Sequence, residues 1–128
     1  MQQIMSRRFL LTFTVLFGCL LLLYGCRHDA LIPLSNAPIM SFKNDIQPIM
    51  ISNCTQSGCH GSSGHRFKLI TYNDVLSIVK AGDPHSSELY SSITANTLNT
   101  MPQPPNPRLS DTQIKTIYVW ILQGAKNN

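Results

Sequence analysis

Two cysteines and a histidine lie close together in the stretch NCTQSGCHGSSG, residues 53–64. Four residues separate Cys54 from Cys59, and His60 follows the second cysteine directly. Thiolates and imidazoles bind soft metal ions, and thiols can also pair as a disulfide or attach a cofactor covalently. The spacing of these three residues therefore predicts a chemical site in this part of the chain.

Three uses of the motif are compatible with its residues. A disulfide suits an oxidising compartment, although so short a loop removes little chain entropy. A closed zinc site needs four ligands, and only His65 and His85 are available to join the motif, neither with a recognisable zinc spacing. The third use is haem, because in a Cys-x-x-Cys-His run the thiols become thioethers and the imidazole binds the iron. Here the spacer is two residues longer, and the extra length can bulge outward without moving Cys59 relative to His60.

Met101, in the stretch NTMPQPP, is a candidate second iron ligand. A low-spin electron-transfer haem needs a ligand on each side of the ring, and a soft methionine thioether suits the iron and raises the potential. The prolines around Met101 predict a rigid loop that can hold a weak ligand in one place. A methionine that only packs on the core would look the same in sequence. His85 and His65 are the alternative ligands, and His65 lies only five residues beyond His60.

Residues 1–25 have the organisation of a bacterial lipoprotein signal peptide. Arg7 and Arg8 precede an unbroken apolar run that is slightly short for a membrane-spanning helix. The run ends at LYGC, which resembles a lipobox, so Cys26 is the expected lipidated N-terminus. Cleavage before Cys19 would leave an apolar stretch on the mature chain, and an uncleaved membrane anchor is the other alternative. In each case the folded part is expected outside the cytoplasm and on a membrane.

Residues 26–41 are expected to form the lipidated N-terminus and a flexible tether, because they contain two prolines and no sustained helical or strand period. Residues 42–128 then form one small domain. Without Arg7 and Arg8 the net charge falls from +4 to +2, which is too weak for a nucleic-acid-binding surface. Charged residues make up 12% of the chain, so strong steering of a highly charged partner is not expected.

The clearest helix in the domain is the last one. Ser110 and Gln113 have the spacing of a capping box, apolar residues recur at helical spacing behind them, and Gly124 ends the helix. A shorter first helix has apolar residues on one face from residue 42 onward. Within it, Pro48 requires either a late start near Asn44 or a kink.

Two further helices are expected between these. One is capped by Thr71 in TYNDVLSIVKAG, and the other has Pro84 at its first position in DPHSSELYSSI. Alternating strand patterns are nearly absent, which predicts an all-α fold. The expected apolar wall of the domain comprises Phe67, Leu69, Tyr72, Leu76, Leu89, Tyr90, Ile93 and Leu98.

Five stretches in this order resemble the small class I c-type cytochromes, in particular a lipoprotein-like branch with longer spacing between the cysteines. They are FKNDIQPIM, CTQSGCHG, AGDPHSSELYSSI, MPQPP and LSDTQIKTIYVWILQGA, and they cover nearly all of residues 42–124. The departure from the usual family pattern is the four-residue spacer between Cys54 and Cys59. It leaves open which machinery attaches the haem.

The resemblance implies an all-α fold of about four helices around one covalently bound haem c. By it Cys54 and Cys59 carry the thioethers, His60 is the proximal iron ligand and Met101 the distal one. The first and last helices would cross near Trp120 or Tyr118. The implied protein is a monomeric one-electron carrier and not an enzyme. It would be held on the periplasmic side of the bacterial cell envelope or at the outer membrane, and it would meet other redox proteins at an exposed haem edge.

Two other functions stay open. If Met101 is not a ligand, an open iron position could bind a small gas, and the protein would be a haem sensor or a subunit of a larger haem enzyme. If haem is absent, Cys54 and Cys59 would form a disulfide in a haem-free binding lipoprotein.

Overall fold

The computed structural model describes residues 36–64 and 67–128, which belong to one compact unit. The expected signal peptide over residues 1–25, the lipidation candidate Cys26, the alternative Cys19 and His65 lie outside the described residues. Of the tether over residues 26–41, only residues 36–41 are described.

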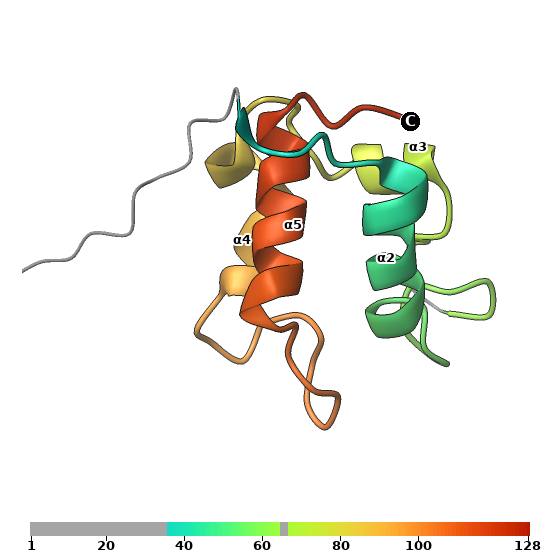
Figure 1. The fold of residues 1–128 in the computed structure, drawn as a ribbon. Coiled ribbons are helices and arrows are strands. Elements are labelled where there is room, and N and C mark those ends of the chain that lie inside the picture. Colours follow the sequence, from blue (N-terminus) through green and yellow to red (C-terminus); the bar gives the residue numbers. More distant parts are fainter. Residues whose placement is uncertain (1–35, 65–66) are drawn as a thin grey trace, which may run out of the picture. The chain divides into compact units, whose positions relative to one another are not determined.

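The described residues form helices and turns and contain no strand, so the all-α prediction is confirmed for them. The order of elements is η2 (Phe42–Ile46), α2 (Gln47–Asn53), α3 (Tyr72–Leu76), η3 (Pro84–Ser86), α4 (Glu88–Thr94) and α5 (Asp111–Leu122). α2 and α5 run in opposite directions (Figure 1). The end of α2 that leads into the cysteine motif therefore lies at the same end of the domain as the loop before α5.

The first helix begins at Phe42, so the late start near Asn44, one of the two alternatives for Pro48, is not observed. Ser41 is its N-cap, and the Ser41 hydroxyl accepts the Asn44 N–H at 3.2 Å. A π-helical turn, η2, follows and leads directly into α2, where Pro48 occupies the first turn. Proline is tolerated there because the first N–H groups of a helix have no partner within it. The wide turn at residues 42–46 thus takes the place of the late start near Asn44.

The helix after Thr71 has the predicted cap but is short. Thr71 and Asp74 form a capping box, in which the Asp74 carboxylate accepts the Thr71 N–H at 2.8 Å. α3 then ends at Leu76 and the chain turns, whereas TYNDVLSIVKAG was expected to continue as a helix.

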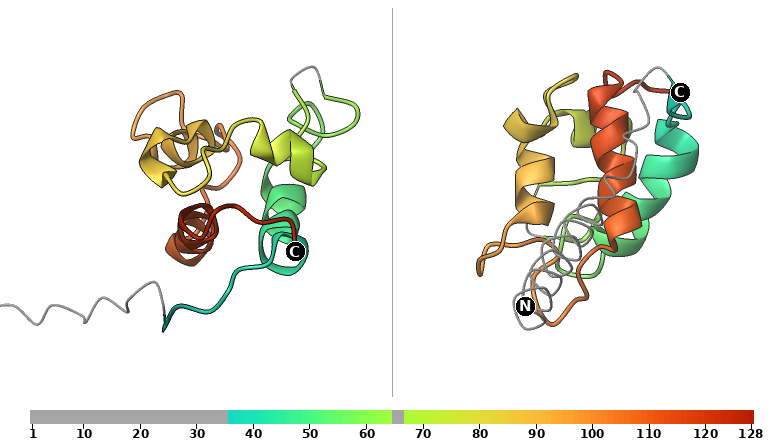
Figure 2. Two further views of the ribbon diagram at one scale, coloured as in Figure 1. Left: turned by 90° about the horizontal axis from the view of Figure 1, so that it is seen from above. Right: turned by 60° about the vertical axis from the view of Figure 1, so that its left-hand side comes forward.

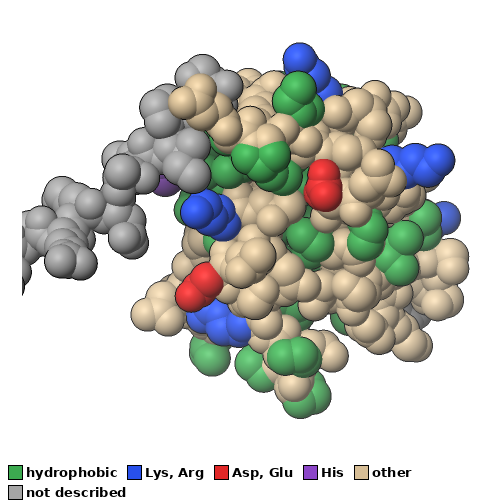
Figure 3. Space-filling view, viewed as in Figure 1, with side chains coloured by type: hydrophobic (Ala, Val, Ile, Leu, Met, Phe, Trp, Pro, Cys, Tyr) green, Lys and Arg blue, Asp and Glu red, His purple; other side chains and the backbone are tan. Residues whose placement is uncertain are grey.

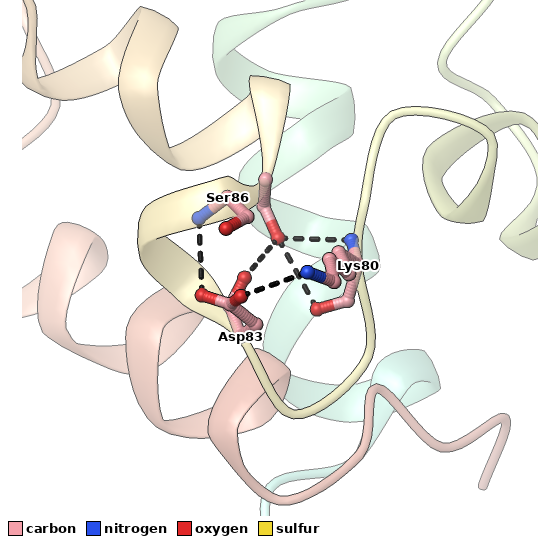
Figure 4. A network of polar contacts seen from close by, with 4 residues as sticks. Lys80, Asp83 and Ser86 are labelled. Atoms are coloured by element: carbon pink, nitrogen blue, oxygen red, sulfur yellow. Dashed lines mark hydrogen bonds and ion pairs between the residues drawn. The ribbon is translucent and has the colours of Figure 1, made fainter.

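The stretch DPHSSELYSSI forms two elements and not the single helix that was expected. Pro84 begins the short 3-10 turn η3, and the extended backbone of Ser87 separates it from α4. The Ser87 hydroxyl accepts the Lys80 N–H at 2.9 Å and donates to the Asp83 carbonyl at 2.8 Å. Asp83 in turn accepts the Ser86 N–H and pairs with the Lys80 ammonium at 3.1 Å (Figure 4). These side chains bond to backbone groups of the turn that would otherwise lack partners, and they thereby interrupt the helix.

α5 has the predicted boundaries and packs against η2, η3 and α4. Both bonds of the capping box between Ser110 and Gln113 are present, and Gly124 follows the helix with φ +97°. Trp120 is fully buried, and its ring lies 5.8 Å from the ring of Phe42 in η2. The contact between the first and last helices therefore involves Trp120.

The opposite side of α5 faces α4. Tyr118 packs there against Tyr90 with ring centroids 5.3 Å apart. The arrangement of α5 between the first helix and α4 can be followed in Figure 2. On the face shown in Figure 3 charged side chains are few and scattered, in keeping with the low share of charged residues.

Candidate functional site

One cavity of about 390 Å³ brings the predicted site residues together. Cys54, Cys59 and His60 line it, and so does Met101 from the loop before α5. The sequence separates Met101 widely from the motif, so packing of the helices brings the four side chains to one place. The apolar part of the wall consists of Phe67, Leu69, Ile78, Leu89, Ile93, Pro102 and Pro104.

α2 positions the first cysteine. Cys54 is the C-cap of α2, and its N–H donates to the Met50 carbonyl at 2.8 Å. The same helix buries Ile49 and Met50 in the core, so its orientation is set by apolar packing. Cys54 is consequently buried at the end of a firmly packed helix.

The spacer between the cysteines protrudes into solvent. The Cys59 N–H donates to the Gln56 carbonyl at 2.9 Å, which closes a turn with Gly58 at φ +79° in its third position. A positive φ at that position favours glycine. The His60 N–H returns to the Cys54 carbonyl at 3.0 Å, so the motif forms a closed loop. The residues between the cysteines thus extend outward while Cys54 and His60 stay buried.

The His60 ring is held in a defined orientation. Its Nδ1 lies 2.8 Å from the Phe67 carbonyl oxygen, and its own carbonyl accepts the Leu69 N–H at 2.9 Å. Because a carbonyl can only accept, Nδ1 must carry the proton in this bond. In the neutral ring Nε2 then has a free lone pair, which is the form in which an imidazole binds a metal ion.

Gly61 and Gly64 allow the backbone to fold closely around the motif. A Cβ atom on Gly61 would lie 2.5 Å from the Thr55 carbonyl oxygen, and one on Gly64 would collide with the Cys59 carbonyl. Neither contact can relax cheaply, because both involve backbone atoms. These glycines are therefore required by close packing within the loop.

A backbone hydrogen bond to α4 fixes the position of Met101. Its N–H donates to the Ser92 carbonyl at 3.0 Å, and its side chain is half-buried. The neighbouring Thr100 N–H bonds to the Thr97 carbonyl at 3.1 Å, which makes a turn before it. The loop is thus fixed at Met101 itself and at the turn that precedes it.

The two thiols are free and do not form a disulfide. Burial, with a further contribution from the nearby Cys59, raises the pKa of the Cys54 thiol to about 11. Cys54 is therefore protonated at neutral pH and is a poor thiolate ligand in this state.

His85 does not line the cavity. It is exposed and packs edge-on against Tyr90 and Tyr118, with ring centroids 5.5 and 5.8 Å away. The structure therefore does not bring it together with Met101 and the motif. Over residues 36–64 and 67–128 no group of three or more His, Cys, Asp or Glu side chains is placed to hold a metal ion.

No family model, curated protein or solved structure matches this chain. Within the described part of the chain, no helix has the length and apolar character to cross a membrane.

The cavity also contains residues that were not predicted. Glu88, Ser92 and Asn53 line it, and the Phe67 carbonyl fixes the His60 ring. A backbone carbonyl has no sequence signature, and the polar residues have no recognisable spacing relative to the motif. Half of the expected apolar wall, namely Phe67, Leu69, Leu89 and Ile93, lines the cavity, whereas Leu98 is 91% exposed.

Proposed function

We propose that this protein is a one-electron carrier in which a single haem c is attached through Cys54 and Cys59. The observation that carries the proposal is that both thiols, His60 and Met101 line the same cavity. The resemblance of the sequence to class I c-type cytochromes points to the same four residues. The remaining wall is mainly apolar, which suits the flat faces of a porphyrin.

The donor set fits this cofactor. Two reduced thiols can each add across a vinyl group to form a thioether, His60 offers Nε2 as the proximal ligand, and Met101 offers a soft thioether as the distal one. When bound, the haem iron alternates between its ferric and ferrous states and so accepts and releases one electron. The protein supplies attachment, axial ligation and exclusion of water, as cofactor proteins generally do.

The carrier has no substrate in this proposal. His60 and Met101 would together hold the iron and leave it no open position for a small molecule, so the proposed protein is a carrier and not an enzyme. Its partners are other redox proteins that approach the exposed edge near the CTQSGCHG loop over a small, transient interface. Cys26 is the proposed lipid attachment point, which places the domain on the bacterial envelope as a monomer, on the periplasmic side or at the outer membrane.

The first test is covalent haem attachment. The full chain is produced with a cytochrome c maturation system, denatured, extracted with acid acetone and examined as the pyridine haemochrome. A c-type spectrum that stays with the polypeptide is expected. If all haem passes into the solvent while a control cytochrome matures normally, the proposal is wrong and the disulfide lipoprotein becomes the better description.

Matched variants test the role of each residue in haem attachment. Cys54→Ala and Cys59→Ala should each leave a single thioether and shift the haemochrome band, and the double variant should retain no haem. His60→Ala should abolish attachment or give an unstable product, whereas His85→Ala, which changes a histidine away from the cavity, should mature like the parent. Equal behaviour of the two histidine variants would contradict the role of His60.

A further inference from the structure

Glu88 is the only charged side chain among the described residues that line the cavity. It stands in the first turn of α4, next to Leu89, which is buried in the same wall. None of the lining residues within the described part of the chain is a lysine or an arginine. The charge that the described lining residues bring to the cavity is therefore that of a carboxylate.

The Glu88 carboxylate is not neutralised by an ion pair in the described part of the chain. The ion pair formed over residues 36–64 and 67–128 is the one between Lys80 and Asp83. Glu88 is the first residue of α4, and the helix dipole favours a negative charge at that end of a helix. The fold thus tolerates an unpaired carboxylate at the rim of a largely apolar cavity.

A charge beside an apolar wall acts more strongly than one in bulk water. Leu69, Leu89 and Ile93 form low-dielectric material around the cavity, which reduces screening by solvent on that side. A ferric centre carries one more positive charge than a ferrous centre. A nearby carboxylate therefore favours the ferric state.

We infer that Glu88 lowers the reduction potential of the haem held in this cavity. The inference rests on the proposed function. In the reaction concerned, the iron gains one electron from a redox partner or from the reductant used in a titration, no bond forms or breaks, and no proton is transferred at Glu88. Glu88 is a tuning residue that acts through its charge and does not bind the iron.

The test compares Glu88→Gln with Asp111→Asn in the haem-loaded protein. Asp111 is also an exposed carboxylate in the first turn of a helix, but it does not line the cavity. Midpoint potentials are measured by optical titration with mediators at low and high salt. Glu88→Gln should raise the equilibrium constant for reduction by up to about tenfold, or about 59 mV, and added salt should diminish the shift. Asp111→Asn should change it much less.

A charge series keeps the result interpretable if one variant folds poorly. Glu88→Asp should keep the parent potential, and Glu88→Lys should raise it further than Glu88→Gln. The visible and helical circular dichroism spectra of each variant report whether ligation and fold are retained. Equal potentials for Glu88→Gln and Asp111→Asn, with intact haem in both, would overturn the inference on Glu88 alone. Failure of the parent chain to retain haem would instead overturn the proposed function.

Discussion

His60 and Phe67 are joined by two contacts. The Nδ1 of His60 lies 2.8 Å from the Phe67 carbonyl oxygen, and the two rings have centroids 4.5 Å apart. The bond requires the proton on Nδ1 and leaves Nε2 unprotonated in the neutral ring. The orientation of the histidine is therefore set by the protein itself.

This orientation predicts the tautomer of His60 in the haem-free chain. At a pH where the imidazole is neutral, nitrogen-15 NMR should show a protonated Nδ1 and an unprotonated Nε2. His85 is exposed and has only ring contacts with the described residues, so it serves as the internal comparison and should show the usual mixture of tautomers. A majority of the opposite tautomer at His60 would contradict the contact with Phe67.

Replacement of Met101 by alanine should open the distal iron position. The ferric spectrum of Met101→Ala should lose its low-spin character, and the ferrous form should bind carbon monoxide stoichiometrically, whereas the parent should bind none. Met40→Ala is the control, because Met40 is also partly buried but does not line the cavity. If the parent chain itself binds carbon monoxide readily, the gas-binding alternative is favoured over the electron carrier.

Gly61→Ala should destabilise the domain. The added methyl group would lie 2.5 Å from the Thr55 carbonyl oxygen, and the backbone of the motif would have to move. Overpacking of this kind costs about 1–3 kcal/mol in the free energy of unfolding. Urea denaturation should show this loss, whereas Ser62→Ala at the exposed neighbouring position should change stability by less than about 0.5 kcal/mol. Similar losses for the two variants would mean that the close approach at Gly61 is not the cause.

The two thiols of the haem-free protein should react at different rates. Burial raises the pKa of Cys54 to about 11, so iodoacetamide near pH 8 should modify the half-exposed Cys59 first. Both cysteines lie on the tryptic peptide of residues 44–66, so tandem mass spectrometry of this peptide measures the order. Modification of Cys54 before Cys59 would contradict the burial of Cys54.

The raised pKa of Cys54 also makes the stability of the haem-free protein depend on pH. The folded state holds the Cys54 proton more tightly than the unfolded state. The contribution of the protonated thiol to the free energy of unfolding is therefore complete below the ordinary thiol pKa of about 8.5. It is lost as the pH rises from there toward about 11. Cys54→Ala should flatten this part of the stability profile in urea titrations.

Elements with local signals could be predicted from the sequence. The capping box of Ser110 and Gln113 and the glycine at 124 define α5 because the groups involved are only a few residues apart. The helix after Pro84 was predicted wrongly, because the Ser87 hydroxyl bonds to the backbone of Lys80 and Asp83 and holds Ser87 extended. That interruption depends on a turn formed by residues before the helix, which a search for helical periodicity does not detect.

In the candidate site, too, some residues could be predicted from local sequence and others only from the tertiary structure. Cys54, Cys59 and His60 are neighbours in the chain, so their spacing alone marked them as a chemical group, and the apolar periodicity alone predicted an all-α domain. The meeting of Met101 with the motif, the Phe67 carbonyl on His60 and the single carboxylate of Glu88 at the cavity were decided by tertiary structure. Such contacts join residues far apart in sequence, and they form only where helix packing brings distant segments together.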